Sequence, residues 1–223
     1  MNKVKPILAI ETSETICSAA LYYSTEKYFT SAIKLKHSHS EILFEIIEFI
    51  YQQAKINRAE ISSVAVSGGP GSFTGLRIGM AAAKGIASGT GVRLIFVPTF
   101  EALAYQLSSC ISDNNEFIIA NKVNKDEVFY SKFKIKSNSY IFVDELTILT
   151  NEEFVNKSIG IKVFGSASYL LEESKNDIII SSPKAEYVAE WALKFGEKNL
   201  TFDYDYLEPL YLKNFIVKMR HKK

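Results

Sequence analysis

The chain has 223 residues, a length that fits one large domain or two small ones. Its 26 basic and 25 acidic residues nearly balance, so no overall basic field indicates autonomous binding to nucleic acid. Its two cysteines, Cys17 and Cys110, offer neither a disulfide framework nor zinc-ligand spacing. Because the sequence shows no signal peptide and no apolar run of roughly 18 residues, we expect a cytoplasmic protein without a membrane span.

The first 54 residues predict three strands and a helix. Apolar runs at 7–10, 16–23 and 28–35 have short polar connections, which is typical of an antiparallel meander. A helix over 40–54 follows, with Ser38 and Ser40 as candidate caps. Its apolar residues cover roughly 220° of arc, about twice what packing on one sheet requires. We therefore expect this helix to be buried from two directions.

Residues 64–91 predict a strand, a glycine loop and a second helix. The loop 68–72 cannot be regular structure, because glycine admits unusual backbone angles and proline fixes its own φ. In the helix, Gly75, Gly79, Ala83 and Ala87 are four apart and form a stripe almost without side chains. Glycine costs roughly 1 kcal/mol of helix propensity relative to alanine, so we expect a second backbone packed close to the stripe. Three interpretations stay open: a core helix, a core helix that also packs against another protein, and a catalytic helix.

The rest of the chain predicts further alternation and a second domain. A strand at 93–97 and a helix from 100 imply parallel crossovers in a mixed sheet. The polar break at 113–116 divides an N-terminal domain, 1–112, from a C-terminal domain, 113–223. Strands are expected at 117–120, 128–135, 140–149, 161–164 and 178–180, and helices after 165–168 and at 185–195. The aromatic segment 204–214 is expected to lie across the body, followed by a basic solubilising end, 218–223.

The glycine loop lacks the signatures of nucleotide chemistry. No Lys stands where a Walker A motif needs one, and Thr74 occupies the last glycine position of the dinucleotide fingerprint. Backbone N–H groups at the helix N-terminus can still hold an anion, with Gly69, Gly71, Ser72, Thr74 and Arg77 as candidate contacts. Ser72 does not match the Gly-x-Ser-x-Gly pattern of a nucleophile, so no catalytic residue is predicted.

Two groups of polar residues leave alternatives open. Glu11 follows a strand, where its carboxylate can cap the turn or meet a cation or a phosphate-bound metal. His37 and His39 can form surface hydrogen bonds or contribute to a metal site. Because a closed metal site needs three or four ligands, the H-x-H spacing alone predicts none.

Five motifs carry a resemblance to a known family. They are ILAIETS at 7–13, HS at 37–38, GPGSFTGLRIG at 69–79, VPTFEALA at 97–104 and PLYLK at 209–213. In this order they resemble the TsaB (YeaZ) family of bacterial tRNA threonylcarbamoyladenosine biosynthesis proteins. The resemblance implies an α/β, two-domain fold of the actin/Hsp70/sugar-kinase (ASKHA) type, with a mixed five-stranded sheet and flanking helices in each domain.

The resemblance also implies a function without catalysis. Members of the family are non-catalytic paralogues of TsaD, which transfers the threonylcarbamoyl group to the adenosine beside the anticodon of tRNA. They pair with TsaD through the helices that lie here at 40–54 and 73–89, and they serve docking of the ATPase TsaE. Alone they form homodimers through the same face, and tRNA is met only through the complex. The interface is therefore expected at Leu43, Ile47, Ile50, Gly75, Gly79, Met80 and Ala83.

The resemblance implies that the chain has no cofactor of its own. It leaves open that ATP or ADP binds at or near the interface with the partner. Two rival functions stay open, an ATPase or phosphotransferase of the same fold and a peptidase. Glu11 stands where the family usually has Asp, and residues 122–124 depart from a common Asp-Ala-Arg stretch. Residues 118–223 contain only Gly160, Gly165 and Gly196, too few for a second glycine-rich nucleotide clamp.

Overall fold

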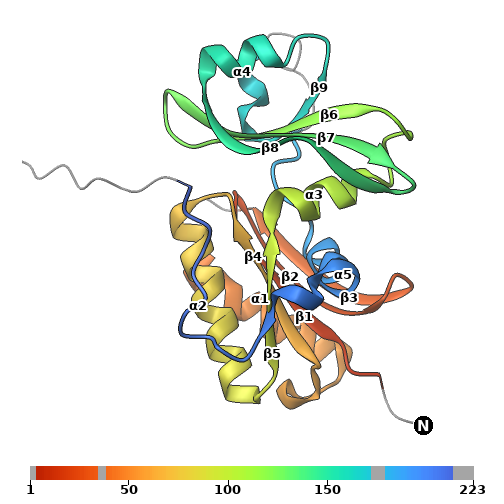
Figure 1. Cartoon of the computed structure of the whole chain (residues 1–223). Coiled ribbons are helices and arrows are strands. Elements are labelled where there is room, and N and C mark those ends of the chain that lie inside the picture. The colour runs from red at the N-terminus through yellow and green to blue at the C-terminus, as the bar shows by residue number, and fades with distance from the viewer. Residues whose placement is uncertain (1–3, 35–38, 172–178, 213–223) are drawn as a thin grey trace, which may run out of the picture.

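Two β-sheets, one above the other in Figure 1, organise the chain. The computed structural model describes residues 4–34, 39–171 and 179–212. The first sheet has the strand order β10-β5-β4-β1-β2-β3, and the second has the order β8-β7-β6-β9. The α/β architecture is thus as predicted, although the first sheet gains a short sixth strand and the second has four strands among the described residues.

The first sheet is part antiparallel and part parallel. Its strands are β1 (Ile7–Glu11), β2 (Ile16–Ser24), β3 (Lys27–Lys34), β4 (Ser63–Gly69), β5 (Arg93–Pro98) and β10 (Leu200–Thr201). The first three strands pair antiparallel, which confirms the predicted meander, and β4 pairs in parallel with both β1 and β5. Parallel pairing brings the carboxyl ends of β1 and β4 to one edge of the sheet, where the glycine loop begins.

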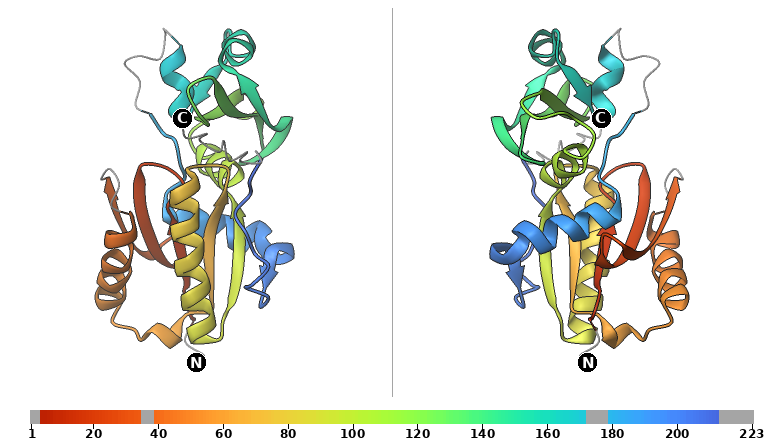
Figure 2. Two further views of the ribbon diagram at one scale, coloured as in Figure 1. Left: turned by 90° about the vertical axis from the view of Figure 1, so that its left-hand side faces the viewer. Right: turned by 90° about the vertical axis from the view of Figure 1, so that its right-hand side faces the viewer.

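Helices cover both faces of the first sheet (Figure 2). Side chains alternate along a strand, so Leu8 and Ile10 of β1 face one core while Ile7 and Ala9 face the other. The first core is closed by α1 (His39–Ala54) and α2 (Phe73–Thr90), and the second by α5 (Ala185–Phe195). A short 3₁₀ helix, η1 (Arg58–Glu60), follows α1.

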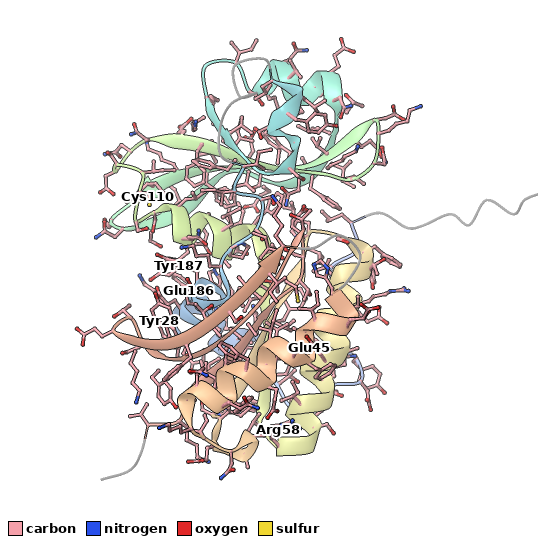
Figure 3. All side chains as sticks on the ribbon, turned by 180° about the vertical axis from the view of Figure 1, so that it is seen from behind. Tyr28, Glu45, Arg58, Cys110, Glu186 and Tyr187 are labelled. Atoms are coloured by element: carbon pink, nitrogen blue, oxygen red, sulfur yellow. The ribbon has the colours of Figure 1, made fainter. Side chains whose placement is uncertain are left out.

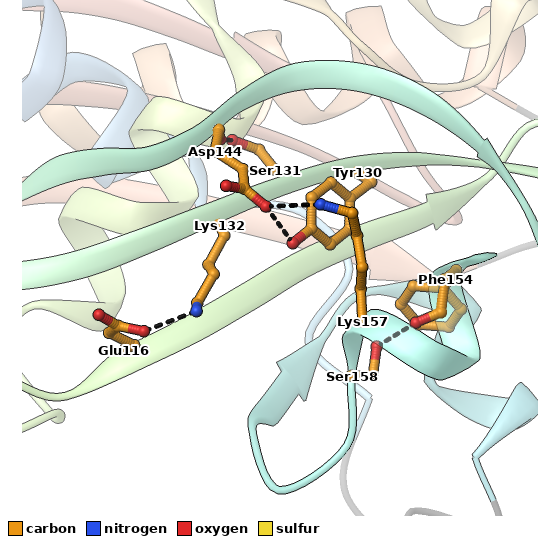
Figure 4. Close-up of polar contacts among 8 residues, drawn as sticks. All are labelled: Glu116, Tyr130, Ser131, Lys132, Asp144, Phe154, Lys157 and Ser158. Atoms are coloured by element: carbon orange, nitrogen blue, oxygen red, sulfur yellow. Dashed lines mark hydrogen bonds and ion pairs between the residues drawn. The ribbon is translucent and has the colours of Figure 1, made fainter.

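The second sheet is covered by α3 (Thr99–Leu107) on one face and by α4 (Asn151–Lys157) and η2 (Ser166–Leu170) on the other. Its strands are β6 (Glu116–Lys122), β7 (Glu127–Lys136), β8 (Ser139–Thr150) and β9 (Lys162–Phe164). Asp144 fastens α4 to this sheet, because it accepts a hydrogen bond from Tyr130 Oη at 2.7 Å and pairs with Lys157 at 3.1 Å (Figure 4). The expected strand at 178–180 is wrong at Ile179 and Ile180, and residue 178 lies outside the described residues.

The chain returns to the first sheet after building the second. The predicted boundary at residue 113 lies between α3 and β6, yet α5 and β10, which the prediction placed in the C-terminal domain, pack on the first sheet. The final described segment lies across the body as expected: Tyr204 Oη donates to Val92 O at 2.6 Å and Leu210 N to Gly68 O at 2.7 Å. His37, Ser38 and the basic end 218–223 lie outside the described residues.

A partly buried series of two hydrogen bonds connects the helices that pack on the two sheets. Trp191 Nε1 on α5 donates to Tyr140 Oη on β8 at 2.8 Å, and Tyr140 Oη donates to Glu101 Oε2 on α3 at 2.6 Å. Burial raises the pKa of the Glu101 carboxyl, while the hydrogen bond from Tyr140 opposes that rise. Trp191 belongs to the helix that covers the first sheet, and Glu101 belongs to the helix that covers the second. These hydrogen bonds therefore fix how the two layers are placed relative to each other.

Candidate functional site

The glycine loop between β4 and α2 is built around the turn that joins β1 to β2. Ser72 caps α2 by accepting a hydrogen bond from Gly75 N at 3.3 Å, and Ser72 N donates to Ser13 O at 2.6 Å. Thr12 Oγ1 donates to Gly75 O at 2.8 Å, which ties the turn to the first turn of α2. The loop therefore encloses a piece of its own chain.

Gly71 of the loop and the two glycines of the predicted stripe leave room for this turn. A Cβ atom on Gly71 would lie 2.5 Å from Ser13 O, and one on Gly75 would lie 2.0 Å from Thr12 O. At Gly79 it would lie 2.2 Å from Thr12 Oγ1. The expected close approach of a second backbone is thus confirmed, and that backbone is the β1–β2 turn of the same molecule.

Three of the five residues predicted to contact an anion, Gly69, Ser72 and Arg77, already have partners within the chain. Gly69 N donates to Thr99 Oγ1 at 3.0 Å. The guanidinium of Arg77 lies 3.9 Å from the ring centre of Phe73, and its Nε donates to Tyr211 Oη at 3.0 Å. Thr74 is exposed on the first turn of α2. Anion or nucleotide contact through Gly69, Gly71, Ser72, Thr74 and Arg77 stays a prediction that this geometry does not favour.

Glu11 is fully buried and caps the β1–β2 turn. Its carboxylate accepts hydrogen bonds from Ser13 N and Ser13 Oγ, each at 2.5 Å, and from Ser67 Oγ. Burial raises the pKa of Glu11 to about 7, because desolvation outweighs these three hydrogen bonds. Burial and the nearby Glu11 together raise the pKa of Glu14 to about 8. The turn-capping alternative for Glu11 is the one that the structure shows.

Among the described residues, no group of three or more His, Cys, Asp or Glu side chains is placed to hold a metal ion. His39 instead sits at the start of α1, where its Nε2 lies 2.9 Å from Glu14 O. The role of His37 as a ligand lies outside the described residues.

The residues predicted to line the partner interface are buried within the single chain. Leu43, Ile47 and Ile50 on α1 pack into the core between the helices and the first sheet, as do Met80 and Ala83 on α2. Gly75 and Gly79 face Thr12, as described above. Their burial does not favour direct contact with a partner, but Ile47 also lines the groove described next, and the assignment of these residues to an interface stays a prediction.

A groove of about 490 Å³ between α1 and α2 is the accessible part of this face. Its walls include Phe44 and Tyr51 from α1 and Arg58 from η1, and Ala81, Gly85 and Gly89 of α2 lie on the opposite side. Figure 3 shows α1 and α2 from behind, with Arg58 near their lower ends. Ala81, Gly85 and Gly89 are four apart, so a second stripe of small residues was visible in the sequence. The sequence prediction missed it because it considered one stripe only.

The family model "TsaD: tRNA N6-adenosine threonylcarbamoyltransferase" matches residues 33–190, which is more than half of the chain. The TsaB protein of Haemophilus influenzae is 27% identical over 223 residues, 93% of each chain, and that of Escherichia coli is 25% identical over 93% of this chain and 94% of its own. Both are named tRNA threonylcarbamoyladenosine biosynthesis proteins.

The chain belongs to the family that the TsaD model describes, and within that family to the TsaB (YeaZ) group. The recognition made from the five motifs is thereby confirmed. YeaZ from Pseudomonas aeruginosa shares the fold, with a TM-score of 0.76 at 20% identity over 93% of this chain and 100% of that one. This likeness confirms the predicted fold class. A TsaD protein of Ehrlichia canis is 30% identical over 133 residues, which cover 53% of this chain and 38% of that protein.

Within the described residues, no helix is both long enough and apolar enough to cross a bilayer.

Proposed function

We propose that the chain is a non-catalytic subunit of the machinery that makes threonylcarbamoyladenosine in tRNA, where it pairs with TsaD and serves docking of the ATPase TsaE. The names of its relatives support the pathway. The pairing is supported by the similarity to TsaD proteins, because two chains of one fold can present like faces to each other. In this proposal the chain works in the cytoplasm and meets tRNA only through the complex.

The groove between α1 and α2 carries this proposal. Its lining is mostly apolar, and Phe44 at its wall is 56% exposed, although a large aromatic side chain is most stable when it is covered. The glycine loop, by contrast, encloses the β1–β2 turn and offers its N–H groups to neighbours in the chain. An open apolar groove beside a closed loop favours binding of a protein over chemistry at the loop.

The same face would serve self-association when TsaD is absent, so that homodimer and heterodimer exclude each other. ATP or ADP near the contact between subunits stays part of the proposal as a nucleotide that the complex holds, with no cofactor on the chain itself.

Two phenylalanines on α1 provide a matched test. Phe44 lines the groove, whereas Phe49 is 50% exposed and lies outside it. We expect Phe44→Asp to raise the dissociation constant for TsaD at least about tenfold, because a central aromatic contact is lost. The variant should then co-elute with TsaD less completely than the unmodified chain. Phe49→Asp should bind like the unmodified chain. Both variants should fold, since each replaced ring is half exposed.

Equal binding by both variants would place the partner on another surface. ATP hydrolysis by the isolated chain would instead favour the ATPase or phosphotransferase alternative.

A further inference from the structure

Segment 213–223, which lies outside the described residues, follows a part of the chain that is fixed beside α2. Leu212 is the last described residue before it, and Tyr211 is held in place because Arg77 Nε donates to its hydroxyl at 3.0 Å. Arg77 and Ala81 are four apart on α2, and Ala81 lines the groove between α1 and α2. The segment therefore starts about one helical turn from an open apolar groove.

The sequence of segment 213–223 combines apolar and basic residues. Phe215, Ile216 and Val217 form one apolar run, and Met219 follows two residues later. Five of the eleven residues are Lys or Arg, and none is Asp or Glu. Apolar side chains are most stable when they are covered, and cations are attracted to carboxylates. The segment thus fits an apolar surface that is bordered by acidic residues.

The groove and the adjoining side of α1 have both properties. Phe44 lines the groove and is 56% exposed, and a Cβ atom on Gly85 opposite would meet no described atom within 4 Å. Glu41 and Glu45 are exposed on α1, and Glu48 lines the groove (Glu45 is labelled in Figure 3). Because these three glutamates are three or four residues apart, they form an acidic stripe along the groove.

The acidic stripe and the start of the segment lie at the same end of the groove, because α1 and α2 begin at the same turn. His39 Nε2 at the start of α1 lies 2.9 Å from Glu14 O. Gly75 O on the first turn of α2 accepts a hydrogen bond from Thr12 Oγ1 at 2.8 Å. Arg58, which follows α1, places a cation at the opposite end of the groove. A basic segment is therefore attracted to the end at which segment 213–223 starts.

The acidic stripe is also within reach of the segment. From Leu212 to Lys218 the chain can span about 20 Å, because extended backbone advances about 3.3 Å per residue. Packed helices have their axes about 8–10 Å apart. The apolar run can therefore cross the groove and bring Lys218 and the following cations to the outer side of α1.

We propose that segment 213–223 covers the groove of its own chain, with its apolar run in the groove and its cations beside the acidic stripe of α1. The segment then competes with TsaD and with a second copy of the chain for one face. This competition rests on the proposed function, whereas the covering of the groove does not. The covering also removes Phe44 from water in the free chain.

Carbodiimide coupling of the full-length chain tests the covering without TsaD. The reagent joins a lysine amine to a carboxylate in contact with it, and mass spectrometry identifies the joined peptides. A mixture of isotope-labelled and unlabelled chains distinguishes links within one chain from links between two. We expect links within one chain from Lys218, Lys222 or Lys223 to the acidic stripe. Glu152, an exposed carboxylate on α4, is the matched control and should not be linked to the segment.

Phe215→Asp tests the competition, because it places a charge in the apolar run. We expect the links to the acidic stripe to be lost and the dissociation constant for TsaD to fall by about three- to tenfold. An occupied groove lowers the apparent affinity by the fraction of chains that leave it open. Phe202→Asp is the matched control, since Phe202 is 63% exposed and lies outside the groove, and it should change neither result.

The outcomes separate this inference from the proposed function. If the segment is not linked to the acidic stripe, or if Phe215→Asp leaves the links unchanged, the inference is wrong whether or not TsaD binds. Links that join only labelled to unlabelled chains would show that a second copy supplies the segment, which also overturns it. If the links form as expected and the unmodified chain and Phe215→Asp both fail to bind TsaD, the proposed function fails and the covering stands. If Phe215→Asp loses the links but binds TsaD as the unmodified chain does, the competition is refuted.

Discussion

Gly79 and Gly85 of α2 should respond oppositely to the same substitution. They lie about 9 Å apart along the helix, because each residue rises about 1.5 Å. Gly79 faces inward, and a Cβ atom there would lie 2.2 Å from Thr12 Oγ1. Gly85 faces outward, and a Cβ atom there would meet no described atom within 4 Å. Gly79→Ala and Gly85→Ala therefore add one methyl group to the same helix in two different environments.

The magnitudes follow from the contacts. In both variants alanine improves helix propensity by about 0.5–1 kcal/mol. At Gly85 nothing opposes this gain, so we expect the free energy of unfolding to rise by that amount. At Gly79 overpacking costs about 1–3 kcal/mol, and a displaced Thr12 side chain loses its hydrogen bond to Gly75 O, worth about 1 kcal/mol. The net expectation for Gly79→Ala is a loss of about 1–3 kcal/mol.

Urea unfolding followed by circular dichroism measures both variants beside the unmodified chain. For a chain of this size, 1 kcal/mol corresponds to a shift of about 2–4 °C in thermal midpoint, so melting provides a second readout. The reasoning is refuted if Gly79→Ala is as stable as the unmodified chain, or if Gly85→Ala is less stable.

Two further predictions concern buried polar groups. Burial raises the pKa of Glu11 to about 7 from an ordinary 4.5, so the folded chain binds the Glu11 proton more tightly than the unfolded chain does. The free energy of unfolding therefore falls by about 3 kcal/mol as the pH rises from 4.5 to 7. Glu11→Gln should reduce that fall in urea titrations from pH 5 to 8, leaving the part due to Glu14, and an unchanged profile would contradict the assignment. Tyr140→Phe removes the hydroxyl between Trp191 and Glu101, and should cost about 2–3 kcal/mol because both neighbours lose a partly buried hydrogen-bond partner. The control is Tyr28→Phe, because Tyr28 is exposed. Equal stability of the two variants would show that the hydrogen bonds of Tyr140 do not hold the layers together.

Local patterns predicted the elements of this fold well. The three-strand meander, the strand–loop–helix unit and α5 all follow from hydrophobic periodicity and glycine placement, which are properties of neighbouring residues. The pattern gave no sign that α5 and β10 return to the first sheet. An amphipathic helix shows that it has an apolar face, but it does not show which of two sheets that face will cover.

The candidate site was harder to predict because its contacts are distant in sequence. The glycine stripe predicted a close backbone, yet Thr12 lies 63 residues before Gly75, so the stripe could not identify the turn. The wide apolar arc of α1 predicted burial from two sides, and the structure fills it with the first sheet and α2. Among the described residues of α1, Phe44 and Phe49 are the large apolar side chains that stay exposed, and the sequence pattern cannot distinguish them from the buried ones.

The two small-residue stripes of α2 now have different physical explanations. The stripe through Gly75 and Gly79 admits the β1–β2 turn, so its glycines serve the stability of the single chain. The stripe through Gly85 and Gly89 has no such contact among the described residues, yet it carries the same cost in helix propensity. Gly85 and Gly89 line the groove between α1 and α2, which is the face where we propose that TsaD binds. The loop that could have held a phosphate is filled from within, while the outward side of the same helix stays open for recognition.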